Sequence, residues 1–501
     1  MSVHVVTADE SAALDAAAIA GGIPSRALMR AAAFNAASVT AEFCGQRLAG
    51  GVTVFCGSGN NGGDGWALAG ALLRSGVPVR VREVSEARTE DARAERASLV
   101  HIIASDPVTS AVVIDAIVGT GARGKLHGDS VMAAREIAAA RKRGAIVVSL
   151  DLPSGVDATD GATDAATDGC VSADLTISFG TMKRGAVMSR GACGEIVVVD
   201  IGLDAASDGP PELVDARFVR RHIPPIAADA HKGTRKSVAI IAGAENMGGA
   251  AILAATAALR SGVGLVQVVT APANVSAMHT QVPEALVAPL DKAYSTIENW
   301  ADAILIGPGL GTDAKTSDFI RELVGRWRGP IVLDAGAISA FDGDTEALAR
   351  SLRGRPAIIT PHPGELARLI GCDIDDVLRR RFDIGSELAK QIGAVVLLKG
   401  TPTVAFDPDG ARLVSAAGTP VLATGGSGDA LSGIVATLLA QDCRPLVAAV
   451  CAAWVHGRAG ELTHGIRGHR LSDVLEHLPE AWRADLTEPA YPVLARLPAV
   501  A

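Results

Sequence analysis

Glycine-rich and acidic segments in the first half of the chain follow apolar runs that predict β-strands. The segment GSGNNGGDG covers residues 57–65, directly after one such run, and Asp115 and Asp151 each end another. The carboxyl ends of parallel strands meet at one edge of a sheet, so these loops predict a shared ligand site. Glycines let the backbone approach a ligand closely, and a helix start offers free N–H groups to a phosphate.

Three oxygen-bearing side chains at this edge indicate a cation. Asn61, Asp115 and Ser154 are hard donors with no cysteine or histidine among them. Such a set suits an alkali or alkaline-earth ion rather than zinc. A single aspartate at a strand end can equally cap a helix. Three polar loops at one edge favour ligand binding instead.

The second half of the chain carries residues suited to phosphoryl transfer. TGGSGD at 424–429 precedes a predicted apolar helix near 430–441. Its glycines and the helix N-terminus predict an anion hole. Asp429 stands at the mouth of that helix, where a carboxylate can take a proton from a substrate hydroxyl.

Three further loops of this half follow predicted strands. KGTPT at 399–403 can hold a nucleotide phosphate through Lys399 and backbone N–H groups, although a lysine at a strand end is often only solvated. GPGLG covers 307–311 and TPHPGE covers 360–365. His362 is held between two prolines at the predicted ligand edge.

The elements that must position these loops alternate between short apolar runs and longer amphipathic ones, which predicts doubly wound parallel sheets. Aromatic residues are only 3% of the chain, so the cores must consist of Ala, Val, Leu and Ile. Strands are expected at 51–57, 78–84, 111–119, 145–153, 174–180, 194–202, 237–243, 264–270, 303–309, 330–336, 357–365 and 394–400, and helices at 8–40, 66–76, 130–143, 250–262 and 430–441.

The length of 501 residues predicts more than one domain. The periodic pattern lapses over 203–230, where prolines and small polar residues indicate a linker. We therefore expect two domains, at 1–209 and 210–501.

Composition excludes several classes of protein. A formal net charge of -9 disfavours nucleic acid as a partner, and no apolar stretch is uninterrupted enough to predict a membrane span. The seven cysteines are scattered without a CxxC pair, which indicates reduced thiols. The N-terminus has no basic region typical of a signal peptide. These observations predict a cytoplasmic location.

Several of these motifs resemble a known family. GSGNNGGDG, DAIVGTG and DLPSGVD resemble NAD(P)H-hydrate epimerase domains. HKG, ALRSGVGLV, GPGLG, TPHPGE, KGTPT and TGGSGD resemble ADP-dependent NAD(P)H-hydrate dehydratase domains of the ribokinase-like superfamily. Their order over nearly the whole chain is similar to that of the bifunctional NAD(P)H-hydrate repair enzymes. The resemblance implies an N-terminal Rossmann-like domain and a C-terminal ribokinase-like domain, both α/β and doubly wound.

The resemblance also implies ligands for each site. The first would hold hydrated NADH or NADPH, with potassium on Asn61, Asp115 and Ser154; the second would hold the S hydrate and ADP with Mg²⁺. In the first site the hydrate would contact Asn60, Asn61, Gly62, Gly63, Asp64, Gly119, Thr120, Gly121, Ala122, Arg123, Gly124, Lys125 and Asp151. In the second, Ala250, Gly309, His362 and Asp429 would contact the hydrate, and Lys399, Gly400, Thr401, Pro402, Thr403 and Gly428 the nucleotide. We further expect a homo-oligomer.

The resemblance implies epimerisation of the hydrates followed by dehydration. Phosphorylation would turn the hydroxyl on C6 of the reduced nicotinamide ring into a good leaving group. Asp429 is the predicted base on that hydroxyl, and the amides of 425–428 the predicted stabilisers of the phosphoryl group. Asp151 is the candidate acid or base of epimerisation.

Two positions depart from the family pattern. HKGTRK carries Lys236 where the family usually has glycine, and LDAGAI carries Gly336 where it usually has a second acid. The first departure bears on the nucleotide end of the site, and the second removes a carboxylate near the ligand edge.

Two alternatives stay open from the sequence. A vitamin-precursor or sugar kinase with an N-terminal ligand-binding module shares TGGSGD and the fold. A non-enzymatic first domain that binds RNA or protein is the other. The second glycine-rich loop disfavours a simple kinase, and the acidic balance disfavours RNA.

Overall fold

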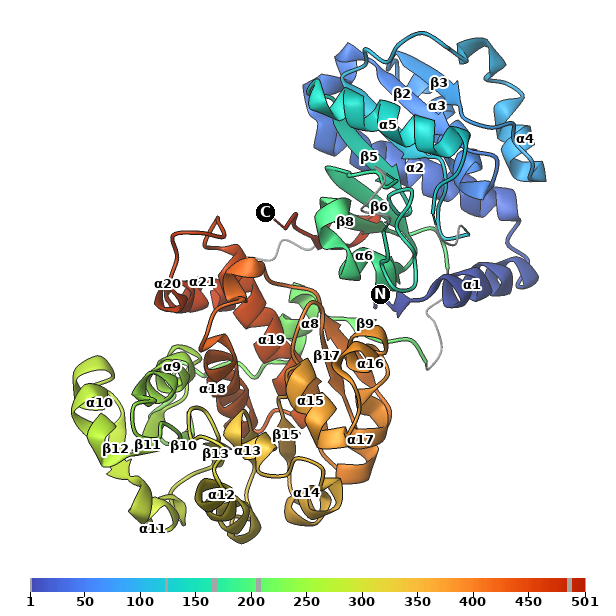
Figure 1. Cartoon of the computed structure of the whole chain (residues 1–501). Helices are drawn as coiled ribbons and strands as arrows, with labels where there is room; N and C mark the ends of the chain where they lie inside the picture. Colours follow the sequence, from blue (N-terminus) through green and yellow to red (C-terminus); the bar gives the residue numbers. More distant parts are fainter. Residues whose placement is uncertain (1, 122–124, 164–168, 204–208, 484–488, 501) are drawn as a thin grey trace. The chain divides into compact units, whose positions relative to one another are not determined.

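The computed structural model describes residues 2–121, 125–163, 169–203, 209–483 and 489–500. The chain forms two compact units, Met1–Leu213 with Thr487–Val500, and Val214–Leu486 (Figure 1). The division after Leu213 lies close to the predicted one at 209/210. The expectation that all of 210–501 belongs to the second domain is wrong for the C-terminal segment, which joins the first unit.

The sheet of the first unit has the strand order β19-β8-β6-β5-β4-β2-β3. All its strands are parallel except β19, which runs antiparallel to β8. Each expected strand of this half forms, with shorter bounds than the apolar runs suggest. The strands are β2 (Val52–Cys56), β3 (Val79–Glu83), β4 (Val112–Ala116), β5 (Ile146–Leu150), β6 (Leu175–Phe179), β8 (Glu195–Val199) and β19 (Val493–Leu497).

Helices cover both faces of this sheet. α2 and α3 pack over one face through a buried cluster that includes Ala36, Trp66 and Leu72, and Ile137 of α5 packs over the other. A two-stranded parallel ribbon of β1 (Val5–Val6) and β7 (Met182–Lys183) stands beside it. The helices are α1 (Ala8–Ala20), α2 (Ser25–Cys44), α3 (Asn60–Arg74), α4 (Glu90–Arg96), α5 (Asp129–Lys142), α6 (Arg184–Met188) and α7 (Arg190–Cys193).

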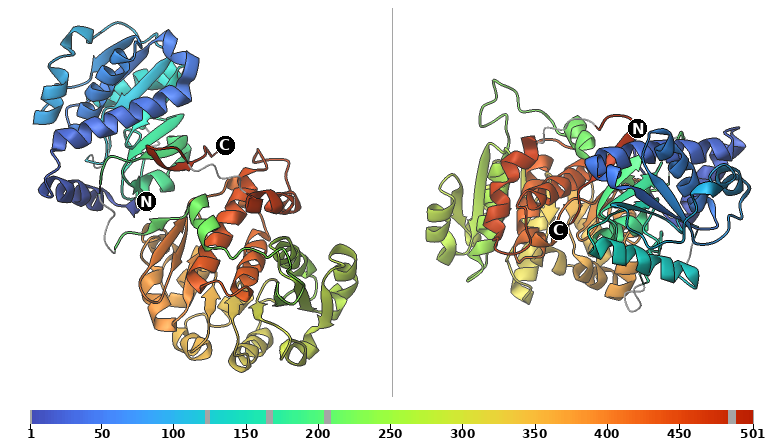
Figure 2. Two further views of the ribbon diagram at one scale, coloured as in Figure 1. Left: turned by 180° about the vertical axis from the view of Figure 1, so that it is seen from behind. Right: turned by 90° about the horizontal axis from the view of Figure 1, so that it is seen from above.

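The C-terminal strand β19 completes the first sheet. Val493, Ala495 and Leu497 are buried, so the strand covers an edge of β8 that would otherwise be unpaired. Arg496 pairs with Glu42 and Glu195, each at 2.9 Å. Figure 2 shows this red segment beside the green strands. Five residues far from their partners in sequence gave too weak a pattern to predict this pairing.

The sheet of the second unit runs β12-β11-β10-β13-β14-β15-β16-β17-β18. It is parallel from β12 to β16, and β17 and β18 are antiparallel additions. The strands are β10 (Ser237–Ile241), β11 (Leu265–Thr270), β12 (Leu286–Pro289), β13 (Ala303–Ile306), β14 (Ile331–Leu333), β15 (Ala357–Ile359), β16 (Val395–Leu398), β17 (Thr403–Phe406) and β18 (Arg412–Ser415); β9 (Glu212–Leu213) ends the first unit.

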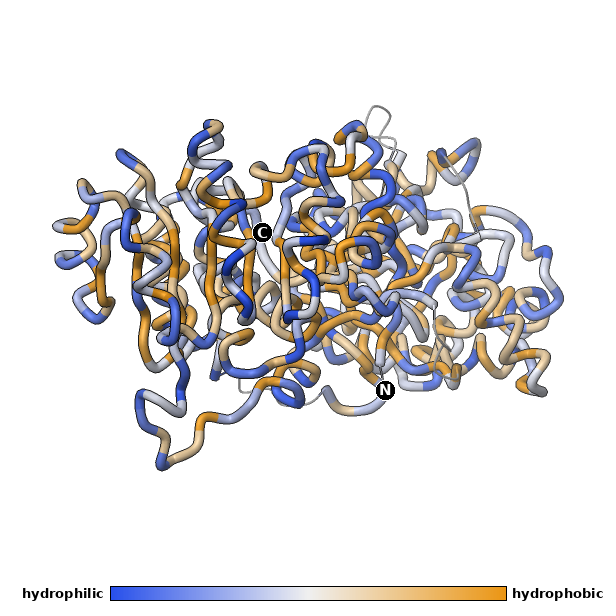
Figure 3. Tube along the Cα trace, turned by 90° about the horizontal axis from the view of Figure 1, so that it is seen from below, coloured by the Kyte–Doolittle hydropathy of each residue, from blue (hydrophilic) through white to orange (hydrophobic). Residues whose placement is uncertain are grey.

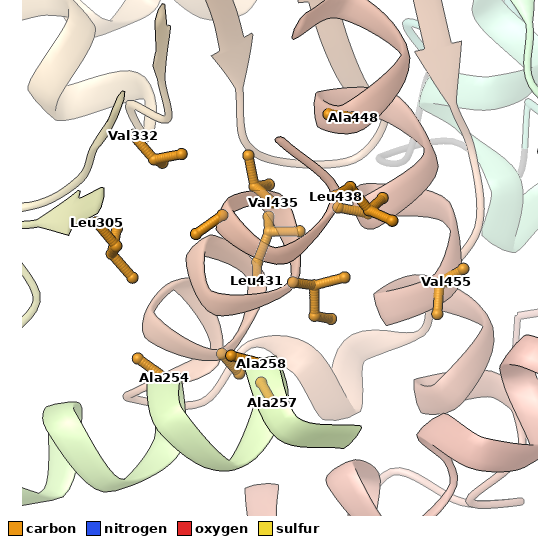
Figure 4. Packing of buried hydrophobic residues seen from close by; sticks show 14 of the residues in the cluster. Ala254, Ala257, Ala258, Leu305, Val332, Leu431, Val435, Leu438, Ala448 and Val455 are labelled. Carbon is orange, nitrogen blue, oxygen red and sulfur yellow. The ribbon is translucent and has the colours of Figure 1, made fainter. Parts of the chain in front are cut away.

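The core of the second unit is built around α18, which is buried along most of its length. Leu431 and Val435 of α18 lie between the small residues of α9 and strand residues such as Leu305 (Figure 4). The helices are α8 (Ala216–His222), α9 (Gly248–Arg260), α10 (Val275–Gln281), α11 (Ala293–Ile297), α12 (Ala314–Arg326), α13 (Gly336–Ser339), α14 (Thr345–Leu352), α15 (Pro363–Ile370), α16 (Ile374–Arg379), α17 (Gly385–Ile392), α18 (Ser427–Ala440), α19 (Pro445–Glu461), α20 (Leu471–Glu476) and α21 (Leu478–Arg483).

The apolar runs of the sequence thus become buried strands, whose side chains face helices on both sides. Along the trace, apolar segments alternate with hydrophilic ones (Figure 3). All but one of the polar loops named from the sequence begin where a strand ends, so each lies at the carboxyl edge of the sheet of its own unit. The exception is TGGSGD, which follows a short 3₁₀ helix at Pro420–Leu422 and leads into α18.

Candidate active sites

The first unit contains a cavity of about 650 Å³ at the carboxyl edge of its sheet. Helices α1, α2 and α3 contribute to its wall, together with the loops after β4 and β5 and the ribbon strand β7. The structure brings together seven of the predicted hydrate ligands in this wall: Asn60, Asn61, Asp64, Gly119, Thr120, Gly121 and Asp151.

Lys183 and Asp151 form a buried ion pair in this cavity. Lys183 Nζ lies 2.5 Å from Asp151 Oδ1, and the lysine side chain is only 1% exposed. The ammonium also donates to Phe179 O at 3.1 Å. Asp151 adopts a left-handed φ of 65°, which a non-glycine residue rarely does. Strain of this kind is typical of residues that the surrounding structure holds for function.

Two further aspartates face the same pair. Burial raises the pKa of Asp64 well above its usual value, and the nearby carboxylates of Asp151 and Asp15 raise it further, while Lys183 lowers it. Burial likewise raises the pKa of Asp15 on α1. Burial thus shifts two carboxyl groups of the cavity toward the protonated form beside a lysine–aspartate pair, a combination that can both give and take protons.

The predicted cation ligands meet at the loop that follows β4. Asp115 is fully buried and accepts from Ser149 Oγ at 2.9 Å and from Ser154 Oγ at 2.6 Å. Ser154 Oγ also accepts from Val118 N at 3.1 Å. A Cβ on Gly119 would lie 3.1 Å from Asn61 Cγ, so the Asn61 amide borders the same loop.

The Asn61 side chain is the unsatisfied member of this group. Its buried amide oxygen and nitrogen have no hydrogen-bond partner within the described part of the chain. A buried unpaired amide is costly unless a ligand completes it. Burial raises the pKa of Asp115, and hydrogen bonds from Ser154, Ile117 and Ser149 oppose that shift. The donor set fits a cation with oxygen ligands.

The glycines of the NNGGDG segment have a packing role in addition to the predicted one. α3 already begins at Asn60, so Gly62 and Gly63 lie inside its first turns. A Cβ on Gly62 would lie 1.9 Å from Gly57 O, and one on Gly63 would lie 2.5 Å from Met29 Cε. These glycines serve close packing against neighbouring segments. The N–H of Gly63 makes the first helical hydrogen bond of α3, to Gly59 O. The amide N–H groups that precede Gly63 in the first turn are therefore the ones that can approach a ligand.

The remaining residues of the predicted 119–125 loop cannot all be placed. Ala122, Arg123 and Gly124 lie outside the described residues. Lys125 is exposed.

The second unit gathers a charged cluster at the carboxyl ends of β14, β15 and β16. Lys399 Nζ lies 2.7 Å from Asp334 Oδ1 and 3.9 Å from Glu365 Oε2. Burial lowers the pKa of Lys399, but the negative charges of Asp334 and Glu365 outweigh it and the net shift is upward. Thr360 Oγ1 donates to Asp334 at 2.8 Å and fixes that carboxylate.

Asp429 faces this cluster from the first turn of α18. Burial raises its pKa to about 6, with Asp334 and Glu365 adding to the shift and Lys399 opposing it. Gly428 allows the close approach, because a Cβ there would lie 3.1 Å from Lys399 Nζ. Ser427 N–H donates a hydrogen bond to Thr424 O, so this N–H is not available as a donor in the predicted anion hole of 425–428.

The other predicted hydrate ligands lie on α9 and on the loops that follow β13 and β15. His362 caps α15, and its Nδ1 accepts from Gly364 N at 3.0 Å, which leaves Nε2 as the protonated nitrogen of a neutral ring. Ala250 and Gly309 touch, since a Cβ on Gly309 would lie 2.8 Å from that of Ala250. The nucleotide loop from Gly400 to Thr403 begins directly after Lys399, and Thr403 Oγ1 donates to Gly400 O at 2.9 Å.

The two departures from the family pattern have local explanations. Lys236 adopts a left-handed φ of 69°, the backbone that favours glycine. Its Nζ lies 2.9 Å from Asp442, which offsets part of that strain. A Cβ on Gly336 would lie 2.4 Å from Gly311 O. A side chain at position 336 would displace the GPGLG loop. The glycine that replaces the family's second acid therefore lets this loop pack closely against residue 336.

Sequence reasoning missed four charged residues of the two sites: Lys183, Asp15, Asp334 and Glu365. Asp334 and Glu365 lie in strand-end segments that were already singled out, so position alone could have indicated them. Lys183 sits in a two-residue strand and Asp15 within an alanine-rich helix. Neither carries a local signal of burial.

Among the described residues, none of the helices combines the length and the apolar character needed to cross a bilayer. The same residues include no group of three His, Cys, Asp or Glu side chains placed to hold a metal ion.

The mostly parallel sheets and the strand-end sites define an α/β enzyme of two units. A family model described as NAD(P)H-hydrate dehydratase matches residues 238–479, and one described as YjeF-related protein N-terminus matches residues 25–185. The chain belongs to the family of bifunctional NAD(P)H-hydrate repair enzymes.

Relatives match nearly the whole chain. The repair enzyme Nnr of Moorella thermoacetica is 35% identical, over 96% of this chain and 97% of that protein. The enzyme of the same name from Escherichia coli is 32% identical, over 87% and 85% respectively. The ADP/ATP-dependent NAD(P)H-hydrate dehydratase of Bacillus subtilis, crystallised with ATP and Mg²⁺, is 30% identical; it covers 55% of this chain and 99% of its own, with a TM-score of 0.50.

Proposed function

We propose that this chain repairs hydrated NADH and NADPH by two activities. The first unit interconverts the R and S hydrates, and the second dehydrates the S hydrate with ADP as the phosphoryl donor. The observation that carries the proposal is Asp429, a half-buried carboxyl with a pKa of about 6 at the start of α18. Family membership supports both activities.

In the second unit Asp429 accepts the proton of the C6 hydroxyl as its oxygen bonds to the terminal phosphorus of ADP. The bond from that phosphorus to the bridging oxygen breaks and leaves AMP. The ring nitrogen then shares its lone pair with C6, and the C6–O bond breaks to release phosphate. Loss of the C5 proton forms the C5–C6 double bond and returns the pair to nitrogen, which yields NAD(P)H.

The amides at the start of α18 stabilise the charge that develops on the transferring group. Gly428 keeps that approach open beside Lys399. The carboxylate of Glu365 would suit an Mg²⁺ ion that arrives with the nucleotide phosphates, because Mg²⁺ prefers one or two carboxylates plus substrate oxygens. Such an ion neutralises phosphate charge.

In the first unit inversion at C6 needs one group to protonate the departing hydroxyl and another to deprotonate the incoming water. Asp64 is the candidate proton donor, because burial and neighbouring carboxylates raise its pKa and so favour its protonated form. Asp151, paired with Lys183, accepts the proton from water. The Asp15 carboxyl stands beside them and completes the acidic wall.

Potassium belongs to the first unit in this proposal. Asn61, Asp115 and Ser154 would hold it, and the unpaired amide of Asn61 supports that assignment. The ion would fix the loop after β4 against the hydrate. Epimerase activity should therefore respond to potassium and not to zinc chelators, and Asp115→Ala should weaken that response. Unchanged potassium dependence in Asp115→Ala would place the ion elsewhere.

The test of the main proposal is direct. The protein receives an epimeric mixture of hydrated NADH together with ADP, and recovery of reduced-nicotinamide absorbance is followed alongside release of AMP. We expect complete recovery with about one AMP per NADH formed, as phosphoryl transfer before elimination requires. Recovery without nucleotide consumption would contradict the proposal. A simple kinase would consume nucleotide without restoring the absorbance.

A further inference from the structure

The lysine of the nucleotide loop is poorly placed to attract phosphate by charge. Lys399 lies within 2.7 Å of Asp334 and 3.9 Å of Glu365, and Asp429 faces the same ammonium. Three carboxyl groups thus surround one positive charge, so the cluster has no net positive charge to offer. A nucleotide with a polyphosphate chain needs another source of positive potential near residues 399–403.

A buried arginine lies directly beneath this loop. Arg381 is only 4% exposed, and its NH1 donates to Pro402 O at 2.9 Å and to Lys399 O at 3.3 Å. A Cβ on Gly400, whose φ is 143°, would lie 2.3 Å from the same nitrogen. The guanidinium therefore fixes both ends of the loop, and its position requires a glycine at residue 400.

The charge of Arg381 is uncompensated. In the parts of the chain that the structure describes, no carboxylate pairs with it, and its buried Nε has no hydrogen-bond partner. Arginine stays protonated in proteins, so a full positive charge lies under the loop. Buried charges are usually paired, and an unpaired one beside a ligand loop indicates that the ligand brings the anion.

Two peptide groups of the loop are oriented by this charge. The carbonyls of Lys399 and Pro402 point at the guanidinium. In a trans peptide the N–H points opposite to the carbonyl, so these two peptide dipoles turn their positive ends away from Arg381. The N–H of Gly400 donates to Thr403 Oγ1 at 3.3 Å within the loop. Gly400 and Thr401 are exposed.

We propose that Arg381 is a positioning residue of the nucleotide site, which holds the 399–403 loop in shape and supplies through it the positive potential that binds the phosphates of an adenine nucleotide. This inference rests on the proposed function of the second unit. Arg381 itself does not touch the nucleotide in this arrangement. It acts through the loop carbonyls that it binds.

The experiment compares three full-length variants with the wild-type protein: Arg381→Met, Arg381→Lys and the control Arg380→Met, whose side chain is exposed. ADP affinity is measured by calorimetry at two salt concentrations, and kcat and KM are measured for ADP and for the S hydrate. Epimerase activity of the same samples reports whether the chain has folded.

Arg381→Met should raise the Kd and KM for ADP at least about tenfold, the size of a lost charged hydrogen bond, and flatten the salt dependence of binding. The KM for the hydrate should stay unchanged. Arg381→Lys keeps the charge and should recover both the salt dependence and part of the affinity. Arg380→Met should bind ADP as the wild type does.

Equal ADP affinity in Arg381→Met and wild type would overturn the inference. So would an Arg381→Lys protein no better than Arg381→Met in affinity and salt dependence, because a merely structural role would not follow charge. If Arg381→Met does not fold, Arg381→Lys is compared with the wild type alone. ADP binding that keeps its salt dependence then supports the inference, and loss of that salt dependence contradicts it. Failure of the wild type itself to consume ADP would instead refute the proposed function.

Discussion

The first unit joins Lys183 to Asp151 at 2.5 Å, and the second joins Lys399 to Asp334 at 2.7 Å. Both pairs lie at the carboxyl ends of parallel strands, yet they leave different groups for proton transfer. In the first unit the lysine binds the candidate catalytic aspartate itself. In the second it binds a neighbour and leaves Asp429 without a direct salt bridge among the described residues.

The electrostatic consequence differs accordingly. Burial raises the pKa of Asp64 well above its usual value, which favours an acid in the first cavity beside the paired carboxylate of Asp151. The pKa of Asp429 is raised only to about 6, so the second site holds one base that is mostly ionised near neutrality. A reversible inversion needs an acid and a base together, whereas phosphoryl transfer needs a base in one direction. Three variants test this contrast, and a pair of Lys236 variants tests the backbone of the second unit.

The largest effect should come from Asp429→Ala. Removing the base should lower dehydration of the S hydrate by about 10³-fold or more, within the range of general-base catalysis, and leave epimerisation unchanged. Reduced-nicotinamide absorbance measures the first activity, and interconversion of the hydrates by chromatography measures the second. Asp375→Ala, at an exposed position of the same unit, serves as the control. A loss of both activities would mean that the sites are not independent.

Lys183→Met should produce the converse pattern. The variant removes the ammonium from Asp151 and should lower epimerisation by about 10²-fold. Consumption of pure S hydrate should continue at the wild-type rate, while R hydrate accumulates unused. Lys142→Met changes an exposed lysine of the same unit and should alter neither rate. Normal epimerisation in Lys183→Met would remove this pair from the mechanism.

The pH profile of dehydration should follow Asp429. Below its pKa of about 6 the carboxyl is protonated and cannot accept a proton, so kcat/KM should fall as pH decreases through that value. Asp334→Asn removes a negative neighbour that raises this pKa and should move the fall to lower pH. Epimerisation, measured on the same samples, should keep its own profile. A fall that does not move in Asp334→Asn would mean that another group titrates.

The smallest effect should come from Lys236→Gly. Glycine relieves a left-handed backbone by about 1 kcal/mol, and the lost surface ion pairs cost about as much, so the free energy of unfolding should change by less than about 1 kcal/mol. Lys236→Ala loses the ion pairs and keeps the strain, so it should be less stable than Lys236→Gly. Denaturant unfolding gives both values. Equal stability of the two variants would show that the backbone is not strained there.

Much of this arrangement could be predicted because strand ends are visible in sequence. The runs before Asp115 and Asp151 are apolar and end abruptly, so their loops were expected at one edge. Spacing could not show that Gly62 and Gly63 also allow close packing inside α3. Lys183 was missed because nothing near it in sequence shows that its side chain is buried.

Segments distant in sequence were the hardest to foresee. Asp15 reaches the first cavity from a helix whose pattern predicts only packing, and Arg381 lies between helices without a motif of its own. Their roles depend on which element the fold places beside them. The pairing of β19 with β8 is the extreme example, since the partners come from opposite parts of the chain.

That pairing has a consequence for biosynthesis. A ribosome delivers the strands of the first unit early, but the edge partner of β8 emerges only after the whole of the second unit has been translated. The first sheet is therefore completed last, although it is begun first. Full assembly of the earlier unit therefore requires translation beyond the second unit, and a nascent chain interrupted before Val493 would expose an unpaired strand edge to aggregation or to quality-control proteases.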